Sequence, residues 1–406
     1  MAAKIKIVFK KENRLACGNS LKNFPHGTRF YTPRLLRDTM KNLRTNMISS
    51  TCFENICQLR RSFHLKKQGF TSNIRTMVFA AIVAMLFSNC ATSELSKSGQ
   101  RKTAGKTFVI VGASSGFGRG VAEKLGEYKA NVVLASRRTE LLEEIAEKIR
   151  GAGGSAVVVT TDITNPDDVR HLTDETLKAY GKIDVWINMA GVGAIGPFWE
   201  IPLEDQVRVV DVNLKGVIYG SHAAIQQFRK QGYGRLINMG SIESVNPLAY
   251  HASYAATKGA VLNFTQALNN ELRLNGYKNI TVVNVEPWAV DTPFWRHAAN
   301  YTGRSPRMAA MDPTHKVVNA TIRTSLRKRK ELPVGWKATG AWLSHRLMPR
   351  ATEKLSANII HKHQIEKAPP AAITSGSLHE PMDGGTGIHD NVRKRMKKEN
   401  KMRKQG

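Results

Sequence analysis

Between about residues 106 and 334, short apolar runs rich in β-branched side chains alternate with longer amphipathic stretches. Such runs are typical of strands buried on both faces, as in a parallel sheet covered by helices. Seven strands are predicted, at Thr107–Val111, Asn131–Ala135, Ala156–Thr160, Asp184–Asn188, Arg235–Met239, Ile280–Val285 and Glu331–Val334. Helices are predicted between them at Phe117–Tyr128, Thr139–Ala152, Pro166–Tyr180, Leu203–Gln231 and Tyr254–Gly276. The alternation predicts an α/β fold, a Rossmann-type doubly wound parallel sheet.

The flanks of this region lack the same pattern. Residues 1–76 show no sustained helical or strand periodicity, so they are predicted to form a poorly ordered basic extension. Residues 77–105 combine a short apolar segment with a linker, and residues 106–350 form the single globular domain. Residues 351–406 are predicted to be a disordered basic C-terminal tail.

The strongest apolar run outside the domain is Met77–Phe87. At about 1.5 Å per helical residue it is too short to cross a hydrocarbon core of about 30 Å. Three interpretations remain open: an interfacial anchor, the core of a signal peptide if translation starts at Met77, and an upstream extension wrongly included in the reading frame. We expect a cytoplasmic or membrane-associated protein, with export through a signal near Met77 as the alternative.

The net charge of +29 is concentrated at the two ends of the chain. Residues 1–76 carry 16 basic and 3 acidic side chains, residues 77–295 carry 22 and 21, and residues 296–406 carry 23 and 8. A nearly neutral centre without a nucleic-acid reader motif disfavours nucleic-acid binding, so the basic ends are expected to be solvated or to touch an anionic membrane. The four cysteines lack paired CxxC spacing, and neither a metal site nor a disulfide framework is predicted.

A glycine-rich turn follows the first predicted strand directly and precedes a helix. Its glycines are Gly112, Gly116 and Gly118, in GxxxGxG spacing. Glycines permit close approach of the backbone to a pyrophosphate, and the free N–H groups at the start of the helix favour negative charge. The strand, turn and helix together predict a dinucleotide-binding loop.

The end of the second predicted strand carries Arg137 and Arg138. An NAD enzyme commonly places a carboxylate here to hold the ribose 2′-hydroxyl. Arginine instead pairs with a 2′-phosphate through forked, charge-assisted hydrogen bonds, and Arg119 is a further candidate for this role. NADP(H) is therefore expected in preference to NAD(H).

Tyr254 and Lys258 are four residues apart on a predicted helix, so they share one face. A cation about 5 Å from a phenol at an effective dielectric of about 20 favours the phenolate by roughly 3 kcal/mol. We therefore expect Lys258 to lower the pKa of Tyr254 and allow proton exchange near neutral pH. A tyrosine and a lysine four residues apart are common on helices, so other motifs have to support a catalytic role for this pair.

Residues 106–295 resemble the short-chain dehydrogenase/reductase family in several motifs that occur in order. Gly112, Gly116 and Gly118 match its cofactor loop, and Asn188, Met189, Ala190 and Gly191 resemble its NNAG segment. Ser241 precedes Tyr254 by the family's interval, and Asn213 aligns with the fourth catalytic member. The cofactor contacts that the resemblance implies are Gly112, Ser114, Ser115, Gly116, Phe117, Gly118, Arg137, Arg138, Asp162, Ile163, Asn188, Ala190, Gly191, Tyr254, Lys258, Pro287, Val290 and Thr292.

The resemblance also implies the roles of the catalytic residues. Tyr254 would donate a proton in carbonyl reduction and accept one in alcohol oxidation, while Ser241 would bind the substrate oxygen. Lys258 would hold the nicotinamide ribose, and Asn213 would position a water linking Lys258 to solvent. The chain departs from the family where Trp288 follows Pro287 in place of the usual Pro-Gly.

The segment after the sixth predicted strand, about residues 294–312, is where the resemblance places substrate selection. Its large side chains are Phe294, Trp295, Tyr301 and Met308. They favour an apolar or bulky small-molecule carbonyl or alcohol, although such residues also pack simply against a domain. We expect a homo-oligomeric carbonyl reductase, with a noncatalytic dinucleotide-sensing or scaffold protein of the same fold as the alternative.

The segment at residues 335–348 alternates apolar and basic side chains at roughly helical spacing. Such a helix suits a membrane surface, and it equally suits docking onto the domain or a second subunit.

Overall fold

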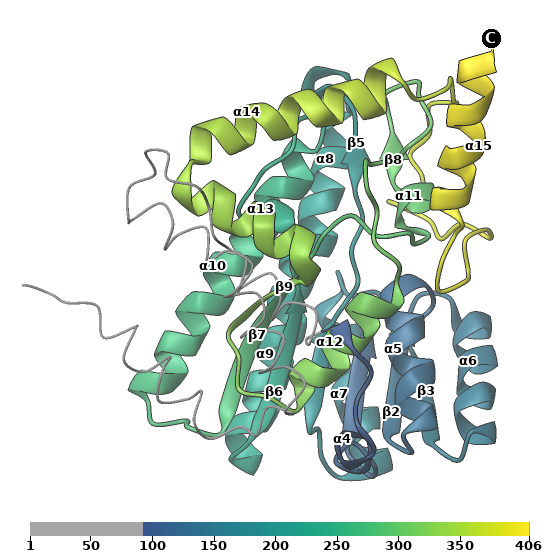
Figure 1. Cartoon of the computed structure of the whole chain (residues 1–406). Coiled ribbons are helices and arrows are strands. Elements are labelled where there is room, and N and C mark those ends of the chain that lie inside the picture. The colour runs from purple at the N-terminus through teal and green to yellow at the C-terminus, as the bar shows by residue number, and fades with distance from the viewer. Residues whose placement is uncertain (1–91, 406) are drawn as a thin grey trace, which may run out of the picture. The chain divides into compact units, whose positions relative to one another are not determined.

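Seven parallel strands form the central sheet of this computed structural model, which describes residues 92–405. The strands are β1 (Thr107–Val111), β2 (Asn131–Ser136), β3 (Ser155–Thr160), β4 (Val185–Asn188), β6 (Gly234–Met239), β7 (Ile280–Pro287) and β9 (Glu331–Val334). Their order is β3-β2-β1-β4-β6-β7-β9 (Figure 1). All seven predicted strands are present, and their bounds differ from the prediction by one or two residues.

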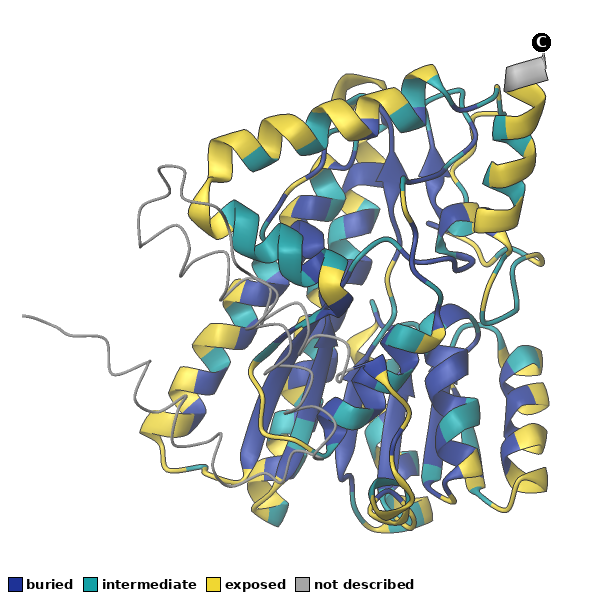
Figure 2. Cartoon of the chain, viewed as in Figure 1, coloured by how far each residue is buried: buried dark blue, intermediate teal, exposed yellow. Residues whose placement is uncertain are grey.

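Helices cover both faces of this sheet. One face carries α5 (Gly116–Glu127), α6 (Thr139–Gly151) and α12 (His315–Ser325), and the other carries α7 (Pro166–Tyr180), α9 (Gly216–Gln231) and α10 (Ala252–Leu274). Successive side chains of a strand point to opposite faces. Accordingly, Phe108 and Ile110 of β1 enter one core while Val109 and Val111 enter the other. The strands are buried throughout the centre of the sheet (Figure 2), which confirms the doubly wound α/β prediction.

The long helix predicted over residues 203–231 is interrupted. It divides into α8 (Leu203–Val210), a π-helical turn (Asp211–Lys215) and α9. Turns of this kind inside α-helices frequently mark functional positions. This one carries Asn213.

Short elements complete the region beyond the carboxyl ends of the strands. Two helices of one turn occur at Phe198–Glu200 (η1) and Ile242–Ser244 (η3), and α11 covers Phe294–His297. Two short strands, β5 (Ala194–Ile195) and β8 (Ala299–Asn300), pair in parallel away from the main sheet. A short helix, α4 (Lys97–Arg101), precedes β1.

The prediction that residues 351–406 are disordered is wrong. The chain continues from α13 (Gly335–Leu347) into α14 (Pro349–Ile360), a π-helical turn (His361–Glu366) and α15 (Val392–Gln405). Arg307 is 1% exposed, and its guanidinium binds Glu399 at 2.8 Å and the Lys367 carbonyl at 2.6 Å. A buried cation needs such acceptors. The tail supplies them, so it is part of the folded domain.

The helix expected at residues 335–348 is α13, which packs against β9 and α14. Within residues 92–405, no helix combines the length and apolar character needed to cross a bilayer. The predicted extension at residues 1–76 and the apolar run at 77–87 lie outside the described residues.

The strand order fixes where a ligand can bind. β1 pairs with β2 on one side and with β4 on the other, so the chain leaves β1 in one direction and later returns to its opposite edge. At such a switch point the loops after neighbouring strands diverge and leave a crevice at the carboxyl ends. The cavity described below opens there.

Candidate active site

The glycine-rich turn lies between β1 and α5, as predicted. Gly118 packs so closely that an added Cβ would lie 2.0 Å from the Gly112 carbonyl oxygen. Gly116 has a φ of +57°, in the region that favours glycine. Both positions therefore require glycine, and the turn brings backbone N–H groups to the cavity at the switch point.

The cavity extends from this turn to Tyr254. Of the predicted contact residues, those lining it are Gly112, Ser114, Ser115, Gly116, Phe117, Gly118, Arg137, Arg138, Asp162, Ile163, Ala190, Gly191, Ser241, Tyr254, Lys258, Pro287, Val290 and Thr292. An added Cβ at Gly116 would project to 3.8 Å from Thr292, and one at Gly191 to 3.7 Å from Lys258 Nζ. The two glycines keep this elongated space open, so the residues present fit a dinucleotide.

Arg137 and Arg138 both reach the cavity from the end of β2. Arg138 donates to the hydroxyls of Ser114 and Ser115, at 2.9 and 3.0 Å. Arg137 is engaged by backbone carbonyls of the C-terminal segment, described further below. Arg119 does not line the cavity, because its guanidinium pairs with two carboxylates on α5 and α6, Glu123 and Glu144, at 2.7 Å each.

Asp162 follows β3 and lies beside Ile163 at the edge of the cavity. Burial acts to raise the pKa of Asp162, but hydrogen bonds from Thr164 and the charge of Arg208 leave that pKa below its usual value. The carboxylate is therefore ionised. It accepts from the Thr164 N–H at 2.9 Å and hydroxyl at 2.8 Å.

Asn188 does not reach the cavity, contrary to the prediction. Its Oδ1 accepts from Trp186 Nε1 at 2.8 Å, and its Nδ2 donates to Asn238 Oδ1 at 2.9 Å. The side chain is 2% exposed and ties β4 to β6 inside the domain. A strand residue points to one face only, and here that face is the core.

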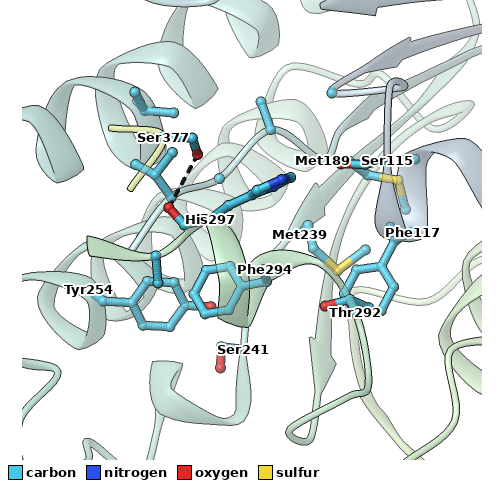
Figure 3. A pocket seen from close by; sticks show the side chains of 18 of the residues that line it. Ser115, Phe117, Met189, Met239, Ser241, Tyr254, Thr292, Phe294, His297 and Ser377 are labelled. Carbon is cyan, nitrogen blue, oxygen red and sulfur yellow. Dashed lines mark hydrogen bonds between the residues drawn. The ribbon is translucent and has the colours of Figure 1, made fainter. Parts of the chain in front are cut away.

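Tyr254 and Lys258 share one face of α10, and Lys258 Nζ lies 5.5 Å from the centroid of the Tyr254 ring (Figure 3 shows Tyr254 beside Ser241 and Phe294). Nζ donates to the Met239 carbonyl at 2.7 Å. Burial lowers the pKa of Lys258 to about 8, although the negative charge of Glu243 opposes this shift.

The predicted lowering of the Tyr254 pKa is wrong for this structure. Burial, followed by the charge of Glu243, raises the pKa of the phenol, and its hydrogen bond with Ser241 offsets this only in part. Desolvation penalises the phenolate more than the neighbouring groups stabilise it. The phenol is therefore protonated at neutral pH.

Ser241 sits at the start of η3 and lines the same cavity. Its Oγ accepts a hydrogen bond from the Glu243 N–H at 3.1 Å. A hydroxyl has one proton and two lone pairs. The backbone bond uses only a lone pair of Oγ, so the Ser241 proton can go to the Tyr254 oxygen or to a substrate oxygen in the cavity.

Asn213 lies behind the cavity rather than in its wall. Its Oδ1 accepts from the Val192 N–H at 2.9 Å, and its Nδ2 donates to the Val192 carbonyl at 2.8 Å. The Nδ2 also reaches Thr257 Oγ1 at 3.3 Å. The π-helical turn thus brings Asn213 to α10 and to the loop after β4, where it fixes the backbone next to Gly191.

A buried acid and a buried histidine at this site were not predicted from the sequence. Glu243 and His251 line the cavity, and His251 Nδ1 lies 3.0 Å from Glu243 Oε1. The His251 ring lies edge-on to the Tyr254 ring with their centroids 6.3 Å apart, and the Glu243 charge acts on the Tyr254 phenol. Neither residue belongs to a recognisable motif. Only their positions in the sequence, close to Ser241 and Tyr254, could have drawn attention to them.

The end of the cavity near Tyr254 is mostly apolar. The side chains lining it there are Leu248, Trp288, Phe294, Trp295 and Met308. The Phe294 ring lies 5.5 Å from that of Tyr254. Tyr301 does not line the cavity, because its hydroxyl binds Asp205. Tyr250 is also directed elsewhere, with its hydroxyl 2.6 Å from His361 Nδ1.

Comparison with known proteins finds relatives that match between 46% and 71% of this chain. The family model for short chain dehydrogenase matches residues 106–301. The uncharacterized oxidoreductase YxnA of Bacillus subtilis is 29% identical over 293 residues, which cover 71% of this chain and 81% of that protein. The uncharacterized oxidoreductase SAUSA300_2422 of Staphylococcus aureus is 36% identical over 187 residues, 46% of this chain and 79% of that protein.

Solved structures give the same result. A short-chain dehydrogenase from Streptomyces avermitilis superposes with a TM-score of 0.54 and 26% identity, over 62% of this chain and 96% of that one. A short-chain type dehydrogenase/reductase from Mycobacterium marinum superposes with a TM-score of 0.50 and 26% identity, over 58% and 96%. With its parallel sheet, glycine-rich turn and Ser241, Tyr254 and Lys258 at one cavity, the chain belongs to the short-chain dehydrogenase/reductase family of oxidoreductases.

Proposed function

We propose that the protein is an NADP(H)-dependent oxidoreductase that interconverts a ketone or aldehyde and the corresponding alcohol. The observation that carries this proposal is the meeting of Ser241, Tyr254 and Lys258 at one end of a cavity whose other end is the glycine-rich turn. This arrangement suits proton transfer next to a bound dinucleotide.

The preference for NADP(H) over NAD(H) rests on the two arginines at the end of β2. Arg137 and Arg138 present guanidinium groups to the cavity, and guanidinium groups attract a 2′-phosphate. A carboxylate in their place would repel that phosphate. Ser114 and Ser115 hold Arg138 in place through their hydroxyls. When bound, the reduced nicotinamide supplies a hydride to the carbonyl carbon and is oxidised to NADP⁺.

Proton transfer is assigned to Tyr254 and orientation of the substrate to Ser241. The Ser241 hydroxyl donates to the carbonyl oxygen, since a carbonyl oxygen can only accept and the bond from the Glu243 N–H leaves the Ser241 proton unused. The protonated phenol of Tyr254 delivers its proton to the same oxygen as the negative charge develops there. In alcohol oxidation the tyrosine takes up that proton instead.

Lys258 provides the positive charge that stabilises the tyrosinate left after proton transfer. Its Nζ is held by the Met239 carbonyl at 2.7 Å and lies 5.5 Å from the Tyr254 ring centroid. Gly191 leaves space beside Nζ for the ribose hydroxyls of the cofactor. Asn213 supports this arrangement by fixing the Val192 backbone.

The substrate proposed is a small carbonyl compound with an apolar body. Trp288, Phe294, Trp295 and Met308 line the cavity near Tyr254. Burial of a substrate against these side chains contributes about 25 cal/mol for each Å² removed from water. The pair Glu243 and His251 adds one polar position to this apolar surface.

The test is an NADPH-oxidation screen over a library of ketones and aldehydes. Tyr254→Phe is expected to lower kcat at least 100-fold, in line with the contribution of a positioned proton donor. Tyr250→Phe is the matched control and should retain activity, since the Tyr250 hydroxyl faces His361 outside the cavity. Turnover by Tyr254→Phe at the wild-type rate would refute the proton-transfer role. NADPH binding without turnover of any carbonyl would instead favour a noncatalytic dinucleotide-binding protein.

A further inference from the structure

The C-terminal segment closes part of the cavity proposed to hold the dinucleotide. Leu378 and Val392 are buried, and we call the residues between them, 379–391, the C-terminal flap. No residue of the flap is buried, although Pro381 and Met382 line the cavity together with the glycine-rich turn. The flap is therefore held by surface contacts, while buried residues anchor it at both ends.

Carbonyl groups of the flap bind the groups proposed to hold phosphates. Arg137 Nη1 donates to the His379 carbonyl at 2.6 Å, and the Gly116 N–H donates to the Gly387 carbonyl at 2.9 Å. The flap makes two further contacts, from Arg138 to the Met382 carbonyl at 3.4 Å and from Arg119, outside the cavity, to the Thr386 carbonyl at 3.0 Å. The flap thus spans the cavity from the end of β2 to the start of α5.

Two side-chain contacts hold the flap at its ends. Asp390 receives hydrogen bonds from Arg296 Nε and Nη2, at 3.0 to 3.1 Å. His379 Nε2 lies 2.7 Å from Asp205 Oδ1 on α8. The Arg296 and His379 side chains are 49% and 47% exposed, whereas those of their partners Asp390 and Asp205 are 11% and 4% exposed, so water reaches each contact from one side only. Ion pairs at such positions are weak and can break readily.

We propose that the C-terminal flap is a wall of the NADP(H) site that opens to admit and release the dinucleotide, with the Arg296–Asp390 ion pair as its latch. The inference rests on the proposed function. The flap carbonyls occupy the Gly116 N–H and Arg137, so the flap has to release both groups before a dinucleotide can bind from the glycine-rich turn to Arg137. Pro381 and Met382, which line the cavity, then cover the bound dinucleotide. Opening breaks backbone hydrogen bonds, the Arg296–Asp390 ion pair and the His379–Asp205 hydrogen bond, and it moves no residue of the hydrophobic cores, which is typical of segments that open locally.

The test measures the rates of NADPH binding and release by stopped-flow fluorescence with the full chain. Asp390→Ala and Arg296→Gln remove the same latch from its two sides. Each is expected to raise both rate constants by about fivefold, the effect of losing a partly exposed ion pair. Glu175→Ala is the matched control, because it removes an exposed ion pair with Lys178 on α7. It should leave both rates unchanged.

Hydrogen exchange provides a readout independent of both rates. NADPH should slow the exchange of backbone N–H groups in residues 379–391 of the wild-type protein, and either latch variant should speed it in the absence of NADPH. NADPH binding with unchanged rates in both latch variants would overturn this inference and leave the proposed function intact. Failure of the wild-type protein to bind NADPH would overturn both.

Discussion

The Glu243 carboxylate and the His251 imidazole form a buried pair, with Glu243 Oε1 3.0 Å from His251 Nδ1. Glu243 belongs to η3, which begins directly after Ser241. His251 lies immediately before α10, which carries Tyr254. The pair therefore joins the two chain segments that carry the proposed substrate-orienting and proton-transferring groups.

Glu243 also places a negative charge near both groups that titrate in the proposed mechanism. It acts to raise the pKa of Tyr254 and that of Lys258. Glu243→Gln removes this charge and keeps a hydrogen-bond acceptor for His251. The pKa of Tyr254 should fall, so its basic form is populated at lower pH, and the rising limb of kcat/KM for alcohol oxidation should move to lower pH. If the rising limb of kcat/KM stayed at the same pH, the Glu243 charge would have no effect on the pKa of Tyr254.

A second variant, Glu243→Ala, should lower the free energy of unfolding by about 1–3 kcal/mol, because it leaves His251 without its hydrogen-bond partner.

Arg137→Ala tests the preference for NADP(H). The substitution removes one of two guanidinium groups proposed for the 2′-phosphate, and the NADPH-to-NADH affinity ratio should fall about tenfold, or about 1.4 kcal/mol. Fluorescence titration with each cofactor measures this ratio. Arg170→Ala serves as the control, because the Arg170 guanidinium pairs with Asp167 on the surface of α7 and does not line the cavity. If Arg137→Ala lowered the affinities for NADPH and NADH by the same factor, Arg137 would not bind the 2′-phosphate.

Asn188→Ala separates a structural residue from a cofactor contact. The substitution leaves Trp186 Nε1 and Asn238 Oδ1 without their partner inside the core. Stability should fall by about 2–4 kcal/mol, because each buried group left unsatisfied costs about 1–3 kcal/mol. The Kd for NADPH of the folded variant should change less than about twofold. Urea unfolding and NADPH titration measure the two effects. Lost affinity at unchanged stability would contradict the placement of Asn188 in the core.

Glu286 makes stability depend on pH. Its carboxyl is fully buried beside Glu331, and burial raises its pKa to about 8. In the unfolded chain the Glu286 carboxyl has its ordinary pKa of 4.5. Between pH 4.5 and pH 8 the folded state therefore binds more protons than the unfolded state. The free energy of unfolding of the wild-type protein accordingly falls as the pH rises through this range. Glu286→Gln should flatten this slope and add on the order of 2 kcal/mol at pH 8. Glu147→Gln, at an exposed position on α6, should leave the slope unchanged. If the free energy of unfolding of Glu286→Gln still fell with rising pH, a group other than Glu286 would be responsible for the pH dependence.

The strands were predictable because burial on both faces demands continuous apolar runs such as Thr107–Val111. The glycine-rich turn was predictable because a bend between strand and helix needs glycine where a Cβ would collide, as at Gly118. The C-terminal helices were not predictable. Their lysines and arginines resemble a solvated tail, and the buried Arg307 that recruits Glu399 is 92 residues away in the sequence.

The sequence by itself determined the doubly wound sheet, the position of the glycine-rich turn, and the sharing of one helix face by Tyr254 and Lys258. Each of these follows from local periodicity and from backbone geometry over a few residues. Tertiary structure alone decided that Asn188 points into the core, that burial and the charge of Glu243 raise the pKa of Tyr254, and that Pro381 and Met382 line the cavity. Those outcomes depend on desolvation and on contacts between distant segments, and neither quantity is encoded in local spacing.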